Sequence, residues 1–377
     1  MHWTTLPQRP GDSLRYNTAV AMRNWRVAVI GRTGRGGYGH NLDLVWKLFR
    51  NVEIVGVADE NPEGLKKAAE RLGVRAAYGD YRQLLKQERP EVVSIAPRWV
   101  DCHLEMVLAA AEAGAHIYME KPMARTPAEA DQMIAACEKA RVKLAVAHQM
   151  RIAPILELAK QRLAEGVIGQ LQELRARGKE DARAGGEDLM VLGTHLFDLM
   201  RQFAGDPLWA FGRVTAAGQE IRRRDVREGN EGLGPLAGDA VAGMFAFRDG
   251  LTGYFASRRN PETSGTRWGL DLYGSSGIMA IRADMNPTVY LCATPRWTDA
   301  PWTRLVLPGD PPPRDTNEAN RALVADLLEA IEQNREPKAS GREARWTIEM
   351  GMALYESQLT GGRVHFPLKN RGNPLAR

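Results

Sequence analysis

Strand-length apolar runs alternate with helical patterns through the first 150 residues of the chain. Thr126 and Pro127 stand at the start of one helical pattern, as an expected N-cap and an expected first helical residue. Regular alternation of this kind predicts a parallel, doubly wound α/β sheet. The expected strands are 26–30, 53–58, 91–96, 115–119 and 143–147, and the expected helices are 39–50, 62–72, 80–88, 101–113 and 127–140.

The pattern changes after residue 150. Alternating segments separated by turn sequences such as Arg248-Asp249-Gly250 and Gly274-Ser275-Ser276-Gly277 are typical of β-hairpins. We therefore expect an arm at 1–24, a first domain at 25–150 and a second α/β domain at 151–377 with a large, mainly antiparallel sheet. The elements expected in the second domain are helices 152–165, 188–204, 318–333 and 341–360, strand-like segments 170–178, 240–247, 251–258 and 268–274, a glycine-rich loop at 179–187 and a proline-rich loop at 308–313.

Composition and charge exclude several classes of protein. Of the 377 residues, 44% are apolar and 26% charged, which is ordinary for a globular chain of about two domains. The formal net charge is +5, but the arginine cluster at 222–227 contains interleaved acidic residues, so we expect no nucleic-acid partner. The three cysteines lack a paired spacing, so neither a metal site nor a disulfide framework is expected. No apolar run is long enough to cross a membrane, and the cytoplasm is the expected location.

A glycine-rich turn follows the first expected strand, in the sequence VAVIGRTGRGGYGH (27–40). A strand, a glycine turn and a helix start can hold a pyrophosphate on free backbone N–H groups. The pattern G-x-G-x-x-G fits Gly34, Gly36 and Gly39 literally, but Gly31 directly follows the strand. We therefore expect Gly31 and Gly34 to be the first two glycines of an enlarged phosphate loop. The other residues of this loop expected to contact a dinucleotide are Arg32, Arg35 and Gly36.

Asp59 ends the second expected strand, 28 residues after Gly31. At that position a carboxylate can accept hydrogen bonds from the hydroxyls of an adenine ribose. It would also repel a 2′-phosphate, so NAD is favoured, and the nearby Arg32 keeps NADP as the alternative. The competing interpretation is that Asp59 only caps the next helix.

Two further segments carry candidate chemistry. Glu120 and Lys121 follow the expected strand 115–119, so their side chains should emerge at the carboxyl edge where open sheets bind ligands. Lys121 could orient a substrate hydroxyl or share its proton, and Pro122 could rigidify the turn, including as a cis bond. A solvated surface lysine is the competing interpretation. His195 stands in an apolar helical pattern, where a structural histidine is common, but an imidazole also suits removal of a hydroxyl proton.

The ordered set of motifs resembles the Gfo/Idh/MocA oxidoreductase family. The motifs are the glycine turn, VAD, the segment SIAPRWVDCHLEMVLAAAEAGAHIYMEKP, GTHLFD and the closing EMGMALYESQLTGGRVHFPL. The likeness extends from about residue 25 to 368. It implies a Rossmann domain that binds NAD(H) or NADP(H), and a second domain whose large sheet forms the substrate site and usually an oligomer interface. Its implied substrates are sugars, inositols and related polyols.

The resemblance also implies roles for single residues. Lys121 matches the family lysine beside the nicotinamide and the substrate, and His195 matches the catalytic histidine. Many members have an aspartate four residues before that histidine, where this chain has Val191; Asp188, two turns away, cannot be assumed to replace it. We expect the loop from Pro97 to His103, after the third strand, to be longer than is usual in the family. Expected near the nicotinamide are Pro97, Arg98, Trp99, His103 and Glu120, and expected near the substrate are Arg151, Lys179 and Asp188.

Three functions remain open from the sequence. In a dehydrogenase, His195 takes the hydroxyl proton, Lys121 polarises or relays, and a hydride moves to NAD. In a redox-neutral glycoside-cleaving enzyme, a transient oxidation permits elimination and the hydride then returns. A regulatory protein would only bind a nucleotide or a sugar, against which the presence of both Lys121 and His195 argues. The expected partners are a small sugar or polyol and further copies of the chain.

Overall fold

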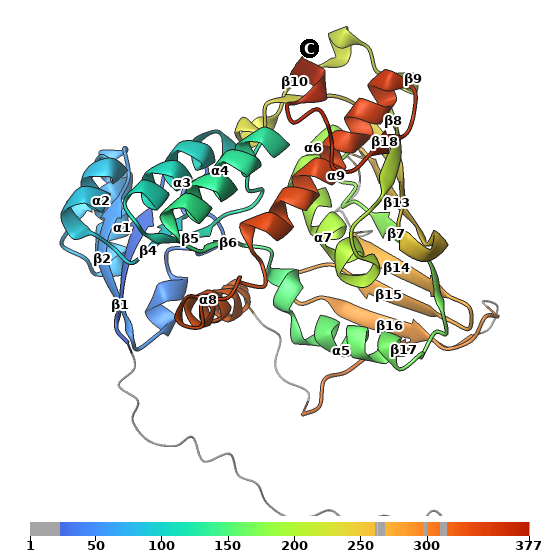
Figure 1. Cartoon of the computed structure of the whole chain (residues 1–377), viewed down its shortest axis with the longest axis horizontal. Coiled ribbons are helices and arrows are strands. Elements are labelled where there is room, and N and C mark those ends of the chain that lie inside the picture. Colours follow the sequence, from blue (N-terminus) through green and yellow to red (C-terminus); the bar gives the residue numbers. More distant parts are fainter. Residues whose placement is uncertain (1–22, 261, 263–267, 297–299, 310–314, 377) are drawn as a thin grey trace, which may run out of the picture.

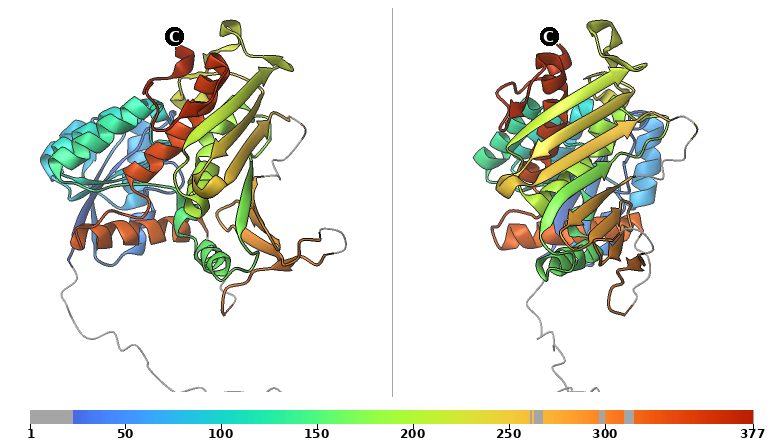
Figure 2. Two further views of the ribbon diagram at one scale, coloured as in Figure 1. Left: turned by 45° about the vertical axis from the view of Figure 1, so that its right-hand side comes forward. Right: turned by 90° about the vertical axis from the view of Figure 1, so that its right-hand side faces the viewer.

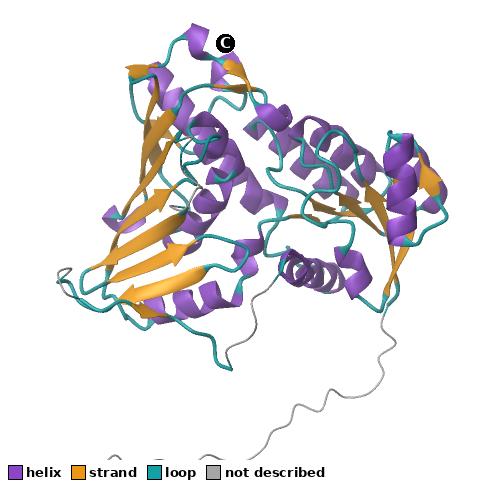
Figure 3. Ribbon diagram, turned by 180° about the vertical axis from the view of Figure 1, so that it is seen from behind, coloured by secondary structure: helices purple, strands orange, loops and turns teal. Residues whose placement is uncertain are grey.

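Two β-sheets organise the computed structural model, which describes residues 23–260, 262, 268–296, 300–309 and 315–376 (Figure 1). The expected arm at 1–24 lies almost entirely outside these residues, as does most of the proline-rich loop at 308–313. The smaller sheet contains the N-terminal strands, and the larger sheet follows after residue 170 (Figure 1). The helices that lie between the two sheets are seen from behind in Figure 3.

The N-terminal sheet is parallel, as predicted, with the strand order β3-β2-β1-β4-β5-β6. Strand β1 pairs with both β2 and β4, so the order reverses there and leaves a crevice at the carboxyl ends of the strands, where such folds bind ligands. The strands are β1 (Trp25–Ile30), β2 (Val52–Ala58), β3 (Ala77–Tyr78), β4 (Val92–Ile95), β5 (His116–Met119) and β6 (Leu144–Val146). The helices are α1 (Pro62–Leu72), α2 (Tyr81–Glu88), α3 (His103–Glu112) and α4 (Pro127–Ala140).

Side-chain caps set the starts of α1 and α4. The Thr126 hydroxyl accepts a hydrogen bond from the Glu129 backbone N–H at 3.2 Å, with Pro127 as the first residue of α4, as predicted. Asn61 caps α1 in the same way, through Gly64 N–H at 2.8 Å. The predicted bounds of α1 and α4 are therefore confirmed.

The helix predicted at 39–50 is wrong. Gly39 and Asn41 have φ values of +58° and +62°, which no α-helix contains, and only a 3₁₀ turn, η1 (Val45–Leu48), forms. Leu42, Val45 and Trp46 of this segment are nonetheless buried, each at 0% exposure. Helix α8 (Thr316–Glu332) packs beside η1, and Leu323 belongs to the same hydrophobic core as Trp46 (Figure 1). A segment from near the C-terminus thus completes the N-terminal unit, while the predicted boundary at residue 150 stays a prediction.

The second sheet has the order β17-β16-β15-β14-β7-β13-β12-β8-β18, with β9 beside β8. Its pairs are antiparallel except for β7 and β13, which are parallel, so the predicted mainly antiparallel sheet is confirmed. The strands are β7 (Leu171–Arg177), β8 (Trp209–Ala216), β9 (Gln219–Glu220), β12 (Ala240–Ala246), β13 (Thr252–Arg258), β14 (Gly269–Gly274), β15 (Ile278–Arg282), β16 (Thr288–Cys292), β17 (Thr303–Arg304) and β18 (Val364–His365); β10 (Arg227–Glu228) and β11 (Pro235–Leu236) form a separate ribbon.

Helices cover one face of this large sheet. Helix α9 (Gly341–Thr360) packs on β8, and it also contacts α4 of the N-terminal unit. The other covering helices are α5 (Pro154–Ala164), α6 (Gly186–Val191) and α7 (Gly193–Ala204). The helix predicted at 188–204 is therefore two helices, which meet at Leu192. In the described part of the chain no helix covers the opposite face, which faces the viewer in the right-hand view of Figure 2.

Candidate active site

A cavity of about 140 Å³ lies between the two units. The N-terminal unit contributes His40, Arg98 and Lys121, which follow the glycine-rich turn, β4 and β5 respectively. The second unit contributes Glu231 and residues of the segment 179–192. Of the predicted site residues, the fold brings Arg98, Lys121, Lys179 and Asp188 together here. The lining residues are His40, Arg98, Lys121, Lys179, Asp181, Arg183, Glu187, Asp188, Val191, Leu192 and Glu231.

Lys121 is buried at the carboxyl edge of the N-terminal sheet. Lys121 is 7% exposed, so it is not the solvated surface lysine of the competing interpretation. The Lys121–Pro122 peptide bond is cis. Burial lowers the pKa of the Lys121 amine, against the opposing effect of the Glu120 and Glu231 carboxylates. The amine is thereby shifted towards the neutral form, which can accept a proton.

Glu120 holds the turn that carries Lys121. One carboxylate oxygen accepts the Lys121 backbone N–H at 2.8 Å, and the other accepts the His40 backbone N–H at 2.9 Å and contacts His40 Nδ1. Burial alone would raise the pKa of this fully buried carboxyl, but His40 and Lys121 hold it at about 2. The sequence prediction missed His40, because 80 residues separate it from Glu120 and no local pattern links the two.

His195 lies on α7, in the turn of helix that follows Val191 and Leu192. It is 6% exposed, and its ring makes edge-to-face contacts with His148 and Trp268, at centroid distances of 5.3 and 5.6 Å. Burial lowers the pKa of His195 well below its usual range, and Lys121 lowers it further. The imidazole is therefore neutral at pH 7, and its catalytic role stays a prediction. The contact of His195 with His148, which follows β6, was not predicted from the sequence.

Asp188 is a second titratable group in the cavity wall. It lies on α6, is 3% exposed, and accepts a hydrogen bond from the Ser257 hydroxyl at 2.6 Å. Burial raises the pKa of its carboxyl to about 6. Gly178 is required beside it, because a Cβ atom there would lie 2.1 Å from the Asp188 carboxylate. Lys179 pairs with Asp181 at 3.6 Å on the same loop.

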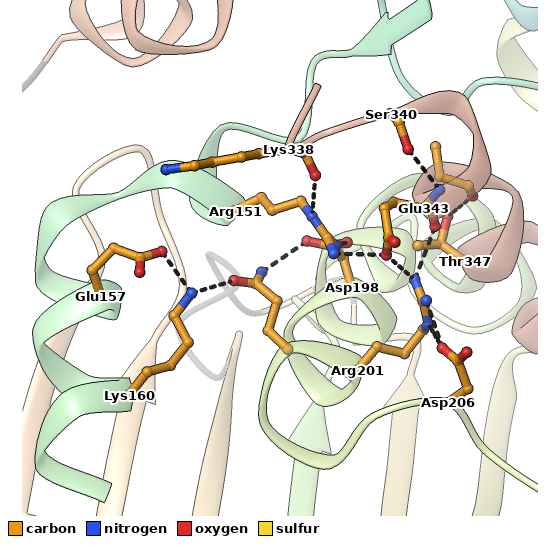
Figure 4. Close-up of polar contacts among 12 residues, drawn as sticks. Arg151, Glu157, Lys160, Asp198, Arg201, Asp206, Lys338, Ser340, Glu343 and Thr347 are labelled. Carbon is orange, nitrogen blue, oxygen red and sulfur yellow. Dashed lines mark hydrogen bonds and ion pairs between the residues drawn. The ribbon is translucent and has the colours of Figure 1, made fainter. Parts of the chain in front are cut away.

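The geometry does not support the predicted substrate role of Arg151, which is absent from the residues lining this cavity. The guanidinium of Arg151, on the 3₁₀ turn η3 (Gln149–Ile152), contacts Asp198 and donates to Glu343 at 2.6 Å and to the Lys338 carbonyl at 2.7 Å (Figure 4). Arg201 extends the network, since it also donates to Glu343 at 2.8 Å. These bonds tie η3, α7 and α9 together and hold the helix that carries His195.

A larger cavity, of about 450 Å³, lies at the carboxyl ends of β1 and β2. Gly31 and Arg32 line it, together with Asp59 and Glu60. Gly31 must be glycine, because a Cβ atom would lie 2.1 Å from the Tyr38 ring. This cavity lies at the point where the strand order reverses, so the residues present fit the adenosine half of a dinucleotide.

The glycine-rich turn closes on itself between Arg32 and Gly37, whose backbones exchange two hydrogen bonds of 3.0 Å. Gly34 and Gly36 have φ values of +85° and +87°, which favour glycine. A Cβ atom on Gly36 would lie 2.5 Å from the Arg98 backbone nitrogen, so this glycine permits close contact with the loop after β4. Because no α-helix begins here, the predicted helix N-terminus for the phosphate is absent.

Asp59 follows β2 and lines this cavity, as predicted. Its carboxylate accepts hydrogen bonds from the Thr33 N–H and hydroxyl, the Tyr38 hydroxyl and the Asn61 N–H, at 2.6–3.1 Å, and the residue is 2% exposed. It therefore fixes the glycine-rich turn, and a direct bond to a ribose stays a prediction. The alternative, that Asp59 caps the next helix, is wrong, because the Asn61 side chain caps α1. The adjacent Glu60 is more exposed than Asp59, and it pairs with Arg32 at 2.7 Å.

The loop after β4 connects the two cavities. The two ring nitrogens of His103 lie 2.7 Å from the Pro97 carbonyl oxygen and 3.1 Å from that of Pro122, so His103 joins this loop to the turn that carries Lys121. Nearby, the Arg35 guanidinium lies over the Trp99 ring, 5.5 Å from its centroid. These positions lie between the adenosine-sized cavity and Lys121, while contact with a nicotinamide stays a prediction for each of them.

The described residues contain neither a membrane-spanning helix nor a metal-binding cluster. No helix there is long and apolar enough to cross a membrane. No group of three or more histidine, cysteine, aspartate or glutamate residues there could hold a metal ion.

Family models match both units of the chain. The model of the oxidoreductase family with an NAD-binding Rossmann fold matches residues 25–148, and the model of the GFO/IDH/MocA C-terminal domain matches residues 156–280. Together they cover more than half of the chain.

Known proteins agree with these matches. The levoglucosan dehydrogenase of Pseudarthrobacter phenanthrenivorans is 29% identical over 60% of this chain and 64% of its own length. The D-apiose dehydrogenase of Paraburkholderia graminis is 26% identical over 92% of this chain and 91% of its own length. A solved structure of levoglucosan dehydrogenase in complex with NADH and L-sorbose is similar in fold, with a TM-score of 0.75 at 24% identity over 92% of this chain and 100% of that one. The chain belongs to the Gfo/Idh/MocA family of NAD(P)-dependent oxidoreductases, and its N-terminal unit is the NAD-binding Rossmann domain of that family.

Proposed function

We propose that this protein oxidises a CH–OH group of a sugar, an inositol or a related polyol, with NAD as the favoured hydride acceptor and NADP as the alternative. The observation that carries the proposal is the position of Lys121. Its buried amine lines a cavity between the Rossmann domain and the second domain, directly after β5. The relatives named above, which are dehydrogenases of levoglucosan and D-apiose, support the substrate class.

The chain's own residues divide the work in this reaction. Bound NAD supplies the hydride acceptor. Lys121 takes the hydroxyl proton, because its pKa is lowered by burial and its amine lines the cavity. Asp188 and Lys179 offer hydrogen bonds to further hydroxyls of the substrate. His195 is not among the residues lining this cavity, so Lys121 is the proton acceptor that we propose, and the catalytic role of His195 stays a prediction.

The cofactor would extend from the larger cavity, past the glycine-rich turn and the loop after β4, to Lys121. Glu60 and Arg32 would contact its adenosine end, and Gly34 and Gly36 its pyrophosphate. Arg32 and Arg35 each lie within 3.7 Å of Asp101, so both arginines border the same path.

We also propose a homo-oligomer formed through the uncovered face of the large sheet. On that face Phe211 and Tyr254 are 44% and 40% exposed, and both pair in register with Met244. Adjacent exposed apolar side chains of this kind are typical of an interface.

One assay separates the functions that the sequence leaves open. The purified protein is incubated with NAD or NADP and a panel of sugars, inositols and glycosides, while NADH formation and release of the leaving group are both measured. NADH formation with a sugar or polyol would support the proposal. Release of a leaving group without net NADH would instead indicate the redox-neutral mechanism, and nucleotide binding with no turnover on any substrate would indicate a binding protein.

A further inference from the structure

We propose that His40, oriented by Glu120, carries the proton from the active-site cavity to solvent during substrate oxidation. The inference rests on the proposed function and adds a residue to it. His40 is the one histidine among the residues that line the cavity around Lys121. Its side chain is 33% exposed, whereas Lys121 and His195 are 7% and 6% exposed. It therefore reaches both the cavity and the solvent.

The backbone of His40 is held in place from both sides. Gly39 brings it close to Glu120, because a Cβ atom on Gly39 would lie 2.5 Å from a Glu120 oxygen. On the other side the buried Asn320 of α8 donates a hydrogen bond of 2.6 Å to the His40 carbonyl. The Asn320 side-chain oxygen accepts bonds from Tyr118 at 2.8 Å and Gln149 at 3.0 Å, which fixes the orientation of its amide. The imidazole thus starts from a rigid position.

Glu120 determines which nitrogen of His40 carries the proton. The carboxylate contacts Nδ1 and is fully buried, and it stays ionised because its pKa is held at about 2. An ionised carboxylate can accept hydrogen bonds but cannot donate them, so the proton of neutral His40 resides on Nδ1. Nε2 is then the proton acceptor, and the carboxylate stabilises the imidazolium formed when Nε2 is protonated. A buried carboxylate orients the histidine of a serine protease in the same way.

The proton moves from the substrate to solvent through two side chains. The C–H bond of the substrate breaks, and its electron pair leaves as hydride to NAD⁺. The O–H bond breaks, its electrons form the C=O bond, and the proton moves to Lys121 Nζ. From Lys121 the proton passes to His40 Nε2 and then to water, which returns Lys121 to the neutral state. One turnover thus releases a ketone or lactone, NADH and one solvent proton.

Several charged groups face His40. From the N-terminal unit these are Glu120, Lys121 and Arg98, and His195 is close enough to interact electrostatically with His40. The groups from the second unit that line the same cavity are Lys179, Asp181, Arg183, Glu187, Asp188 and Glu231. The pH dependence assigned to His40 must therefore be tested by replacing His40 itself.

The experiment compares His40→Asn, His40→Ala and Glu120→Gln with the wild type as NAD-bound proteins. Asparagine keeps an N–H donor for Glu120 but does not titrate. We expect kcat of His40→Asn to fall about 10- to 100-fold, less than for loss of the group that meets the substrate, because water replaces part of the relay. The neutral-pH limb of its kcat profile should disappear, while the NADH dissociation constant stays within about twofold of the wild type. Imidazole added to His40→Ala should restore kcat in a saturable manner.

His365→Asn is the matched control, because His365 is an exposed histidine on β18. It should leave kcat and its pH profile unchanged. An unaltered pH profile in His40→Asn, or a loss of kcat in His40→Ala that imidazole does not restore, would overturn the relay while leaving the dehydrogenase proposal intact.

NMR titration of the NAD-bound protein tests the same assignment without turnover. The His40 signals are identified by their loss in His40→Asn. We expect a neutral ring protonated at Nδ1, and a shift of the tautomer balance in Glu120→Gln. A ring protonated at Nε2 would refute the relay whichever substrate is used, whereas failure to oxidise any sugar would refute only the proposed function.

Discussion

Lys121 illustrates how position alone turns a common residue into a reactive one. A lysine in water is charged at neutral pH, but burial between two domains disfavours the ammonium form. The neighbouring Glu120 moderates this effect, since its carboxylate raises the Lys121 pKa. The net effect lowers the Lys121 pKa, which favours the neutral amine that can accept a proton.

At Lys121 we predict that Lys121→Ala lowers kcat/KM by about two to four orders of magnitude, the usual contribution of a general base. NADH affinity, measured by fluorescence titration, should change little. Lys139→Ala is the control, because Lys139 is an exposed lysine in the last turn of α4. Nearly normal turnover in Lys121→Ala would remove this residue from the mechanism.

At Asp188 we predict a pH-dependent effect on stability. Its pKa is raised from 3.8 to about 6 in the folded protein, so folding favours the protonated form. The associated stability is fully present below pH 3.8 and is lost as the pH rises to about 6. Relative to Asp188→Asn, the wild type should therefore lose up to about 3 kcal/mol of unfolding free energy across this window.

Urea denaturation at several pH values would measure this difference. The control is Asp249→Asn, on an exposed turn. A difference between wild type and Asp188→Asn that does not change with pH would show that the Asp188 pKa is not raised.

Among the elements, the glycine-rich turn and the η3–α7–α9 junction place the site. The turn is fixed by Asp59, and the junction is fixed by the ion pairs of Arg151 and Arg201. Both sets use charged groups of the protein to position other protein segments. The side chains of Asp59 and Arg151 are both bonded to protein groups.

For the glycine-rich turn we predict different effects from two adjacent carboxylates. Asp59→Ala should lower both the unfolding free energy and NAD affinity, because each lost hydrogen bond to a charged group contributes about 1.5–3 kcal/mol. Glu60→Gln should weaken NAD binding without a loss of thermal stability. Calorimetric binding and thermal unfolding of both variants test this, and unchanged stability in Asp59→Ala would restore a purely ligand-binding role for Asp59.

For the η3–α7–α9 junction we predict that Arg151→Met reduces the unfolding free energy by about 2–4 kcal/mol, because it leaves the buried Asp198 without its charged partner. Arg162→Ala, which breaks an exposed pair with Glu165, should cost less than about 1 kcal/mol. Denaturant unfolding compares the two. A raised KM in Arg151→Met with unchanged stability would instead support the substrate role predicted from the sequence.

The candidate active site and the proposed oligomer interface lie on opposite sides of the large sheet. Helices α6, α7 and α9 cover one face and direct residues towards the Rossmann domain, while the other face lacks such a cover in the described residues (Figure 2). Catalysis and assembly can therefore be altered separately.

We predict that Tyr254→Glu on the uncovered face converts an oligomer to a monomer, because a carboxylate is costly to bury in an apolar interface. Size-exclusion chromatography with light scattering would measure the mass. Leu359→Glu is the control, since Leu359 is 52% exposed near the end of α9. A wild-type monomer, or an unchanged mass for Tyr254→Glu, would contradict an interface at this face.

The local pattern predicts much of the fold because its signals are short-range. Hydrophobic periodicity and caps give α1, α4 and the central parallel strands, and turn residues give the hairpins of the large sheet. The helix predicted at 39–50 fails because left-handed residues interrupt an otherwise helical apolar pattern. α8 then fills the adjacent space, which no local signal can indicate.

The candidate site likewise combines features that the local sequence predicts with features that depend on tertiary packing. Strand ends, turns and motifs are local properties of the chain, and they suffice to predict the α/β character, the place of Lys121 after a buried strand and the family resemblance. The bonds of Asp59 and Arg151 to protein groups, and the contact of His40 with Glu120, arise only from tertiary packing. These outcomes depend on which distant groups satisfy each buried charge, and that is fixed only when the chain has packed.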